Sequence, residues 1–428
     1  MKPYCECSRE ELLALKDKLT AQYEEAKAKG LKLDMSRGKP AAEQLDMTMP
    51  MMDIFNSSFD MRDEEGVDVR NYGNLEGSVG ARRLLGSMLG VDPEHVIVFG
   101  TASLSVMYDT VSRSMTHGVM GSTPWCKLDK VKFLCPAPGY DRHFAITEHI
   151  GIEMITIPMK EDGPDMDLVE EYVKDPAVKG IWCVPMYTNP LGITYSEEVC
   201  RRMADLNPAA EDFRVYWDNA YCVHHLYDDR QDTLPEILSM CRANGKEDMV
   251  LIFASTSKIS FAGAGISCIA ASLGNLEWVK KSMTIQIISH DKINQLRHVL
   301  YFKDLEGVKE HMRKHAAIMR PKFELVLETL ERELDGLAIG TWTKPLGGYF
   351  ISFNTMDGCA KAVVERCKEA GVTLTGAGAT YPYKKDPHDS NIRIAPSYPT
   401  LEELKITGEL FVLCVKLVSV EKLLSEKA

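Results

Sequence analysis

Short runs of apolar and β-branched residues recur along the middle of the chain. The runs lie at residues 96–99, 131–134, 154–157, 181–184, 215–217 and 250–253. Segments of helical length that mix polar and apolar residues, such as 167–174 and 196–206, separate several of them. Apolar strands that alternate with helices are typical of a mostly parallel sheet covered by helices on both faces. The pattern therefore predicts an α/β fold, and ligands of such folds bind at the carboxyl ends of the strands.

The two ends of the chain show a different pattern. Ser8 and Glu11 have the spacing of a capping box, which predicts a helix at the amino end. Beyond residue 300, a long charged helical stretch at 305–334 leads to a strand at 347–351 that begins with two glycines. A last apolar helix covers about 401–424. We expect a smaller α+β domain in this part of the chain.

Length and composition narrow the class of protein. The chain has 428 residues, and a single core stops growing at roughly 250–300 residues, so two domains are expected. No apolar run is long enough for a membrane span, and the charged amino end does not resemble a signal peptide. The net charge of −12 argues against a nucleic-acid-binding surface. The 12 cysteines are scattered without a C-x-x-C pair, which is typical of reduced thiols in a cytoplasmic protein.

Two of the predicted strands are followed by residues whose side chains can take part in catalysis or bind a cofactor. Lys258 follows the run 250–253, and a lysine held at the end of a buried strand loses its proton readily and can form a Schiff base. Asp218 and Tyr221 follow the run 215–217, where a carboxylate can pair with a cationic ring nitrogen and a phenol can bind a ring oxygen. Taken singly, Lys258 is more often a surface loop lysine, and Asp218 is equally well explained as the cap of the next helix.

Three more motifs follow predicted strands. Asn189 begins an Asn-Pro-Leu-Gly segment, which on its own favours a turn. Tyr140, in Pro-Gly-Tyr, offers an aromatic face on which a ring can stack, although a packing tyrosine is the commoner case. Thr101, Ala102 and Ser103 open a helical segment after the first strand, and small residues at a helix amino end can bind phosphate.

Order and spacing make these motifs informative as a set. Asn189-Pro-x-Gly, Asp218-x-x-Tyr221, Ser255-x-x-Lys258 and Arg393 resemble the corresponding motifs of the class I (fold type I) pyridoxal-phosphate aminotransferases, the aspartate aminotransferase superfamily. The resemblance extends from about residue 32 to the carboxyl end. The phrases at 138–144 and 255–265 are similar to those of an atypical bacterial aspartate aminotransferase subgroup that is related to regulator-type aminotransferase domains.

The resemblance implies an architecture. It implies the fold type I of the pyridoxal-phosphate transferases, with a mostly parallel, seven-stranded-type sheet in a large domain and a smaller α+β domain. The large, cofactor-binding domain is expected at 60–300. Both ends of the chain, 1–59 and 301–428, are expected to form the small domain.

The resemblance also implies roles around the cofactor ring. Lys258 matches the lysine that holds pyridoxal 5'-phosphate as a Schiff base and then moves the substrate proton. Asp218 matches the carboxylate that keeps the pyridine nitrogen protonated. Asn189 and Tyr221 match the pair that binds the ring oxygen, and Tyr140 matches the stacking aromatic.

A second set of implied roles concerns the cofactor phosphate. Thr101, Ala102, Ser103 and Ser255 match residues that hold the phosphate with backbone amides and hydroxyls. Tyr72 matches a tyrosine that reaches the neighbouring subunit's phosphate, so the resemblance implies a homodimer with shared active sites; an ordinary loop tyrosine is the alternative.

The chain departs from the family at one position. Residues 263–266 read Gly-Ala-Gly-Ile where the family has an arginine that binds the phosphate. Lys39 is a candidate for the missing charge, although a solvated lysine is the simpler interpretation. No metal site is predicted, because the adjacent His224 and His225 cannot both face one ion from a helix.

The resemblance finally implies a substrate site. Arg393 matches the arginine that binds the substrate α-carboxylate through its two-pronged guanidinium. A second cation for a distal carboxylate is expected from Arg37 or Arg142, each of which could instead be a surface arginine, and Arg297 is a weaker candidate from the neighbouring subunit. The predicted substrate site comprises Gly38, Arg37, Arg142, Asn189 and Arg393.

We therefore predict a cytoplasmic pyridoxal-phosphate-dependent aminotransferase. Its best-matching substrates are aspartate as amino donor and 2-oxoglutarate as acceptor, which react in turn through Lys258. The alternatives are an aminotransferase for aromatic or small neutral amino acids, a carbon–sulfur lyase that uses the same cofactor, and a non-catalytic regulator that senses the cofactor. No nucleic acid or membrane partner is expected.

Overall fold

A large mixed sheet forms the centre of the protein in the computed structural model, which describes residues 2–427. Its strands are β2 (Val96–Phe99), β3 (Lys132–Ala137), β4 (Glu153–Lys160), β5 (Gly163–Pro164), β6 (Val178–Cys183), β7 (Arg214–Asp218), β8 (Val250–Ser255) and β9 (Ser267–Ala271). The spatial order is β2-β9-β8-β7-β6-β3-β4-β5. All six apolar runs of the sequence form strands in this sheet, so the predicted α/β fold is confirmed.

Two strands of this sheet were not predicted. β9 inserts between β2 and β8 and runs antiparallel to both, and the two-residue β5 pairs antiparallel with β4. The pairs β3–β4, β3–β6, β6–β7 and β7–β8 are parallel. The carboxyl ends of the parallel strands therefore meet at one edge, where the candidate residues of the sequence are found.

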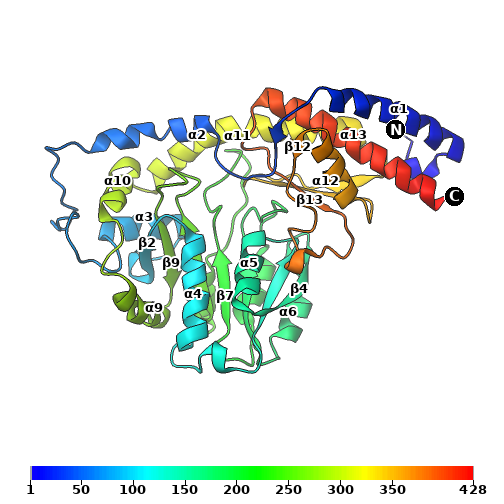
Figure 1. Ribbon diagram of the computed structural model, residues 1–428. Coiled ribbons are helices and arrows are strands. Elements are labelled where there is room, and N and C mark those ends of the chain that lie inside the picture. Colours follow the sequence, from blue (N-terminus) through cyan, green and yellow to red (C-terminus); the bar gives the residue numbers. More distant parts are fainter. Residues whose placement is uncertain (1, 428) are drawn as a thin grey trace.

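Helices cover both faces of the sheet, as alternating apolar strands require. They are α3 (Val79–Leu89), α4 (Ser103–His117), α5 (Asp141–Ile150), α6 (Met166–Tyr172), α7 (Glu197–Asp205), α8 (Ile237–Ala243), α9 (Leu273–Gln286) and α10 (Lys292–Phe302). On β7, Trp217 packs with the core under α3, α7 and α8, whereas Tyr216 packs with the core under α4, α5 and α9. Figure 1 shows α4 and α5 on the near face.

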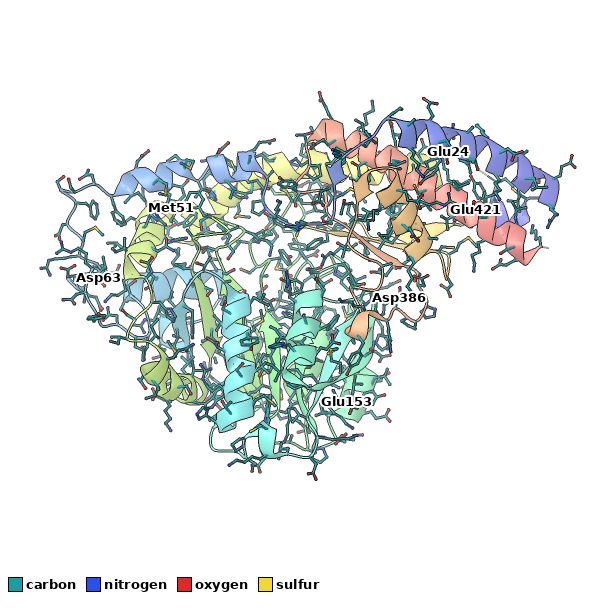
Figure 2. The ribbon with its side chains drawn as sticks, viewed as in Figure 1. Glu24, Met51, Asp63, Glu153, Asp386 and Glu421 are labelled. Carbon is teal, nitrogen blue, oxygen red and sulfur yellow. The ribbon has the colours of Figure 1, made fainter. Side chains whose placement is uncertain are left out.

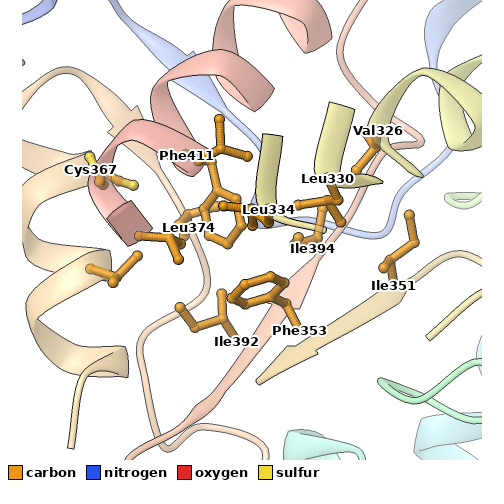
Figure 3. Close-up of a cluster of buried hydrophobic side chains, with 14 of the residues drawn as sticks. Val326, Leu330, Leu334, Ile351, Phe353, Cys367, Leu374, Ile392, Ile394 and Phe411 are labelled. Carbon is orange, nitrogen blue, oxygen red and sulfur yellow. The ribbon is translucent and has the colours of Figure 1, made fainter. Parts of the chain in front are cut away.

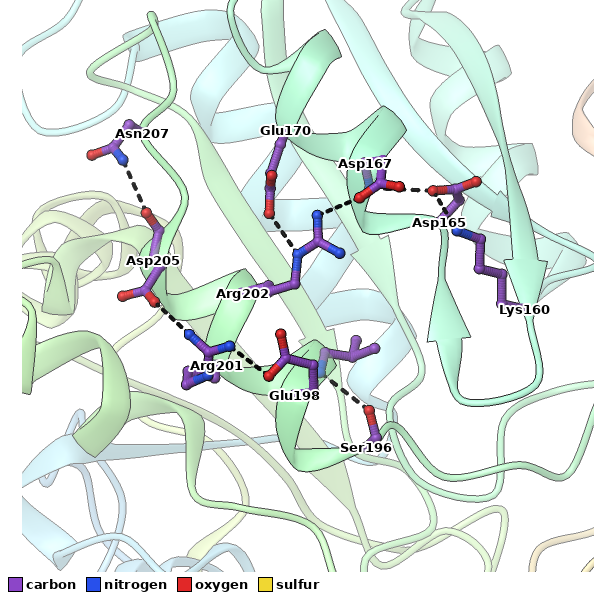
Figure 4. A network of polar contacts seen from close by, with 11 residues as sticks. Lys160, Asp165, Asp167, Glu170, Ser196, Glu198, Arg201, Arg202, Asp205 and Asn207 are labelled. Atoms are coloured by element: carbon purple, nitrogen blue, oxygen red, sulfur yellow. Dashed lines mark hydrogen bonds and ion pairs between the residues drawn. The ribbon is translucent and has the colours of Figure 1, made fainter.

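Exposed ion pairs join α6 and α7 on one of these faces. Arg202 donates to Glu170 at 2.7 Å and to Asp167 at 2.6 Å, as Figure 4 shows. Exposed ion pairs contribute only about 0.2–1 kcal/mol each. The buried apolar residues of the two helices therefore dominate their docking.

Further helices, three of them long, form a second layer above the sheet (Figure 1). They are α1 (Arg9–Ala28), α2 (Ala42–Asp46), α11 (Leu305–Leu334), α12 (Ala360–Glu369) and α13 (Leu401–Glu426). They accompany an antiparallel sheet of β10 (Gly340–Trp342), β11 (Ile351–Thr355) and β13 (Asn391–Ile394), and the parallel pair β1 (Leu33–Asp34) and β12 (Val372–Thr373). Short 3₁₀ helices complete the chain at Tyr4–Glu6, Met49–Ile54, Pro93–His95, Trp125–Lys127, Glu247–Met249 and Pro382–Lys384.

The core of this layer draws on both ends of the chain. Figure 3 shows Leu330 of α11, Phe353 of β11 and Phe411 of α13 packed together. Leu12 and Tyr23 of α1 belong to the same buried cluster. The helices at the two ends lie side by side (Figure 1), and the capping box of Ser8 and Glu11 is present at the start of α1.

The prediction of a strand at 347–351 is wrong for most of this segment. The strand begins only at Ile351, because the preceding segment bends over the large sheet. Gly348 has a φ of +79°, which favours glycine, and a Cβ at Gly347 would lie 2.2 Å from the ring of Tyr187. The two glycines permit a close approach between the layers rather than a strand.

The acidic side chains labelled in Figure 2, such as Glu24, Asp63 and Glu153, lie at the periphery of the molecule. Throughout residues 2–427, none of the helices combines the length and the apolar character needed to cross a membrane.

Candidate active site

Lys258 lies in the loop between β8 and β9, at the carboxyl end of β8. Its Nζ is 4.9 Å from the ring centre of Tyr221 and 5.9 Å from that of Tyr349. Burial lowers the pKa of Lys258, and Arg393 acts in the same direction, whereas Asp218 opposes the shift. The lowered pKa favours the neutral amine, which is the nucleophilic form.

Asp218 ends β7 and is buried beside β8, with which it is in register at Phe253. Its Oδ2 accepts a hydrogen bond of 3.0 Å from Nε2 of His143. Its Oδ1 is also buried, but no hydrogen-bond donor within residues 2–427 reaches it. A buried carboxylate oxygen without a donor is costly, and a protonated pyridine nitrogen would satisfy it.

His143 also contributes to this cluster, although it was not among the predicted site residues; the sequence left open whether it faces the cofactor or has a structural role. It lies on α5, and its ring stacks on Trp182 with a centroid distance of 4.4 Å and an interplanar angle of 13°. Tyr140 approaches the same ring edge-on at 4.9 Å. The hydrogen bond to Asp218 requires the proton on Nε2, and the stacking fixes the ring in that orientation.

Asn189 and Tyr221 lie in the loops that follow β6 and β7. Both are buried, and burial raises the pKa of the Tyr221 phenol well above its ordinary value. Oδ1 of Asn189 accepts from Nη1 of Arg393 at 3.1 Å. The amide nitrogen of Asn189 therefore keeps its two hydrogens for another acceptor, such as a ring oxygen.

The loop between β2 and α4 presents open backbone amides. Ala102 is the N-cap of α4 and supplies no capping side chain, so the first amides of this 15-residue helix are left for another acceptor. The Oγ of Ser257 donates to the carbonyl of Thr101 at 2.8 Å and ties this loop to the segment before Lys258. This arrangement suits the phosphate of the expected cofactor.

Arg393 lies on β13, directly across from Ser352 of β11. Its Nη1 contacts Asp141 Oδ1 at 3.0 Å as well as Asn189, and its Nη2 donates to Oγ1 of Thr375 at 3.3 Å. Its guanidinium lies 4.8 Å from the ring centre of Phe350. These contacts fix the orientation of a largely buried cation beside Asn189.

Gly38 packs closely against the same ring. A Cβ at position 38 would lie 2.2 Å from Cζ of Phe350, a separation that real side chains do not reach. The two residues that the resemblance assigns to the α-carboxylate, Gly38 and Arg393, therefore both contact Phe350. Phe350, Thr375 and Asp141 were not predicted, because nothing in their local sequence marks them.

Other predicted residues lie apart from this cluster or on the surface. Arg37 and Arg142 are both exposed, and Tyr72 is 77% exposed. Nη2 of Arg297 donates to Asn294 at 2.6 Å. The roles predicted for these four residues stay predictions.

The position at which the family has the phosphate-binding arginine is occupied here by an apolar residue, Ile266. Ile266 is buried in the core beneath the sheet, and its backbone amide donates to Oγ1 of Thr256 at 3.0 Å. Nζ of Lys39 lies 3.8 Å from the ring centre of Tyr398, so its charge is held by an aromatic face.

The residues brought together come from loops after five strands and from the upper layer. They provide a deprotonatable amine, a carboxylate with a free oxygen, an amide and a phenol, a helix amino end and a guanidinium. The donor set fits pyridoxal phosphate, because each polar group of that cofactor has a matching partner: the ring nitrogen, the ring oxygen, the aldehyde and the phosphate.

Comparison with known proteins identifies the family of the chain. The family described as "Aspartate amino-transferase" matches residues 7–427. An aspartate aminotransferase of Corynebacterium glutamicum is 47% identical over 401 residues, which is 94% of this chain and 92% of the relative. The crystal structure of an aspartate transaminase from the same species superimposes with a TM-score of 0.96 at 44% identity and covers 98% of this chain and 99% of that one.

A more distant structure shares the fold. The α-aminoadipate aminotransferase of Thermus thermophilus, solved with N-(5'-phosphopyridoxyl)-L-leucine, has a TM-score of 0.72 at 21% identity, over 94% of this chain and 95% of its own. The chain thus belongs to the aspartate aminotransferase family of pyridoxal-phosphate-dependent enzymes.

Proposed function

We propose that this enzyme moves the α-amino group of aspartate to 2-oxoglutarate. The observation that carries the proposal is the buried carboxylate of Asp218, which keeps one oxygen without a donor and acts on the charge of the desolvated amine of Lys258. Arg393 also acts on Lys258, and its guanidinium is fixed by Asn189. The choice of aspartate rests on the Corynebacterium glutamicum relative that carries that name. Membership of an aminotransferase family does not favour the alternative of a non-catalytic regulator that senses the cofactor.

Each residue has a separable task. The neutral amine of Lys258 would hold pyridoxal phosphate at its aldehyde carbon and would move the proton that leaves the substrate Cα. Asp218, oriented by His143, would hold a proton on the ring nitrogen. When bound, pyridoxal phosphate supplies a ring that accepts the negative charge left at Cα. Asn189 and Tyr221 would donate to the ring oxygen, and Thr101, Ala102, Ser103 and Ser255 would hold the phosphate.

Arg393 orients the substrate. Its guanidinium binds the α-carboxylate, with the backbone of Gly38 on the other side, so that the Cα–H bond faces Lys258. Arg37 or Arg142 binds the distal carboxylate of aspartate. Their exposure fits a position at the mouth of the site, where the side chain of a dicarboxylic substrate ends.

The functional unit is a homodimer with shared active sites, with the large domain at 60–300 and the small domain at 1–59 and 301–428. Support comes from the exposed Tyr72, and from Ile285 and Ile288, which are large apolar side chains exposed to solvent in one chain. The 12 free cysteines suit the reducing cytoplasm, in which we place the enzyme.

The test of the activity is direct. Purified enzyme with pyridoxal phosphate, aspartate and 2-oxoglutarate should form oxaloacetate, and Lys258→Ala should abolish this while Lys18→Ala, an exposed lysine on α1, leaves it unchanged. A panel of aromatic, small neutral and thioether amino acids, followed over the first half-reaction, separates the alternatives. Preference for any of them over aspartate refutes the proposed substrate.

The shared site has its own test. A mixed dimer of Tyr72→Phe and Lys258→Ala chains contains one site with both changes and one with neither if Tyr72 serves the partner's site. Such a dimer should recover about half of the wild-type activity. If Tyr72 serves its own chain, every site in the mixed dimer carries one change, and no fully wild-type site can form.

A further inference from the structure

The arginine proposed for the substrate already has a carboxylate partner within the chain. Oδ1 of Asp141, at the first position of α5, is 3.0 Å from Nη1 of Arg393. Arg393 is only 8% exposed, whereas a third of the Asp141 side chain remains accessible. The pair therefore lies at the boundary between the protein interior and the site.

The remaining contacts of Arg393 show where a substrate can bind. Nη1 is shared between Asp141 and Asn189. Nη2 makes only the longer contact of 3.3 Å to Thr375, and Nε has no acceptor within residues 2–427. A substrate carboxylate can thus reach Nη2 while Asp141 stays on Nη1, and one guanidinium charge then serves two carboxylates.

With two carboxylates on one guanidinium, the site carries one negative charge in excess. The two substrates differ in whether they supply a positive charge that balances it. The α-carbon of an amino donor carries an ammonium as well as a carboxylate, so its α-groups are neutral together. The α-carbon of a 2-oxo acid carries a carboxylate alone. Because Asp141 already neutralises Arg393, a bound oxo acid leaves one unbalanced negative charge in a poorly solvated place, and an amino acid does not.

We propose that Asp141 determines the relative affinity of the enzyme for its two substrates, by weakening the binding of 2-oxo acids through its ion pair with Arg393. This inference rests on the proposed function. Asp141 shares the guanidinium with the substrate carboxylate and itself takes no part in proton transfer. The opposite interpretation is that Asp141 only anchors Arg393 in the correct orientation.

The variant Asp141→Asn separates the two interpretations, because an asparagine oxygen still accepts from Nη1 but carries no charge. If Asp141 competes with the substrate carboxylate for Arg393, Asp141→Asn should lower the KM for 2-oxoglutarate about tenfold, which is equivalent to about 1.4 kcal/mol. The KM for aspartate should change less than about threefold. If Asp141 only anchors Arg393, both KM values should rise or stay the same, and either result overturns the proposal. Asp17→Asn, on the exposed face of α1, is the control for net charge.

A binding measurement avoids the reaction. Succinate has two carboxylates and no ammonium, and 2-methylaspartate has the ammonium but no Cα proton to lose. By calorimetry on the holoenzyme, Asp141→Asn should lower the Kd of succinate about tenfold relative to that of 2-methylaspartate. An unchanged ratio of the two Kd values overturns the role of Asp141. Absence of oxaloacetate formation by the wild type instead refutes the proposed function, since the ratio does not depend on turnover.

Discussion

Replacement of Arg393 by lysine tests the substrate site most sharply, because it keeps the charge and removes the fork. The guanidinium of Arg393 is held by Asp141, Asn189 and Thr375 and lies over Phe350. A lysine ammonium is a point charge on a flexible stem and cannot make these contacts and bind a carboxylate in a fixed plane at the same time.

The size of the effect follows from the hydrogen bonds that a lysine cannot make. A carboxylate that binds two N–H groups of Arg393 gives up at least one charge-assisted hydrogen bond in the variant, worth about 1.5–3 kcal/mol. Since each 1.36 kcal/mol is a factor of ten, kcat/KM should fall roughly 10- to 150-fold. The decrease should be similar for aspartate and alanine, because both have the α-carboxylate.

The assay is the first half-reaction, followed by the change in cofactor absorbance over a range of donor concentrations. Arg37→Lys and Arg142→Lys are the comparison variants, and whichever of them binds the distal carboxylate should affect aspartate but not alanine. A decrease smaller than threefold for Arg393→Lys, in protein whose urea unfolding matches the wild type, would refute the assignment of Arg393 to the α-carboxylate.

Three further outcomes are expected. Gly38→Ala should raise KM for every donor by about tenfold, because the new Cβ displaces Phe350, on which the guanidinium rests; steady-state kinetics measure this, and an unchanged KM contradicts it. Asp212→Ala should lower the free energy of unfolding by about 3–5 kcal/mol in urea, because it leaves the ammonium of Lys179, now 2.6 Å from Asp212, buried without a partner; a decrease below about 1 kcal/mol would show that water reaches this lysine. Burial lowers the pKa of His315 to about 3, so between the ordinary value of 6.5 and that value the unfolded chain binds one more proton than the folded chain. Stability should fall by about 1.4 kcal/mol per pH unit below 6.5 from this residue, and His315→Gln should show a correspondingly weaker pH dependence in urea unfolding; equal slopes would disprove the assignment.

Much of the large sheet is predictable from local pattern. The run 250–253 is continuous and apolar, and it forms β8 as expected, because a strand covered on both faces has no polar face to show. β9 was missed, although it is equally buried, because Ser-Cys-Ile-Ala-Ala contains small residues with weak strand preference. Only its two neighbours in the sheet make it a strand.

The site divides in the same way. Lys258, Asp218 and Asn189 can be grouped from the sequence because each follows a strand and the family resemblance ties them together. Asp141 and Thr375 are not found, since their importance comes from a contact with Arg393 across 252 and 18 residues of chain, respectively. No local pattern records a contact over such separations.

The pairing of α1 with α13 has a consequence for biosynthesis. A ribosome adds about 5–20 residues per second, so roughly 20–80 seconds separate the synthesis of these two helices. During that interval Leu12 and Tyr23, which are buried in the finished protein, have no partner on α13, whereas β2 to β9 are all available to pair. The nascent chain should therefore fold from its middle outward, and its first helix should be a substrate for chaperones until the last one emerges.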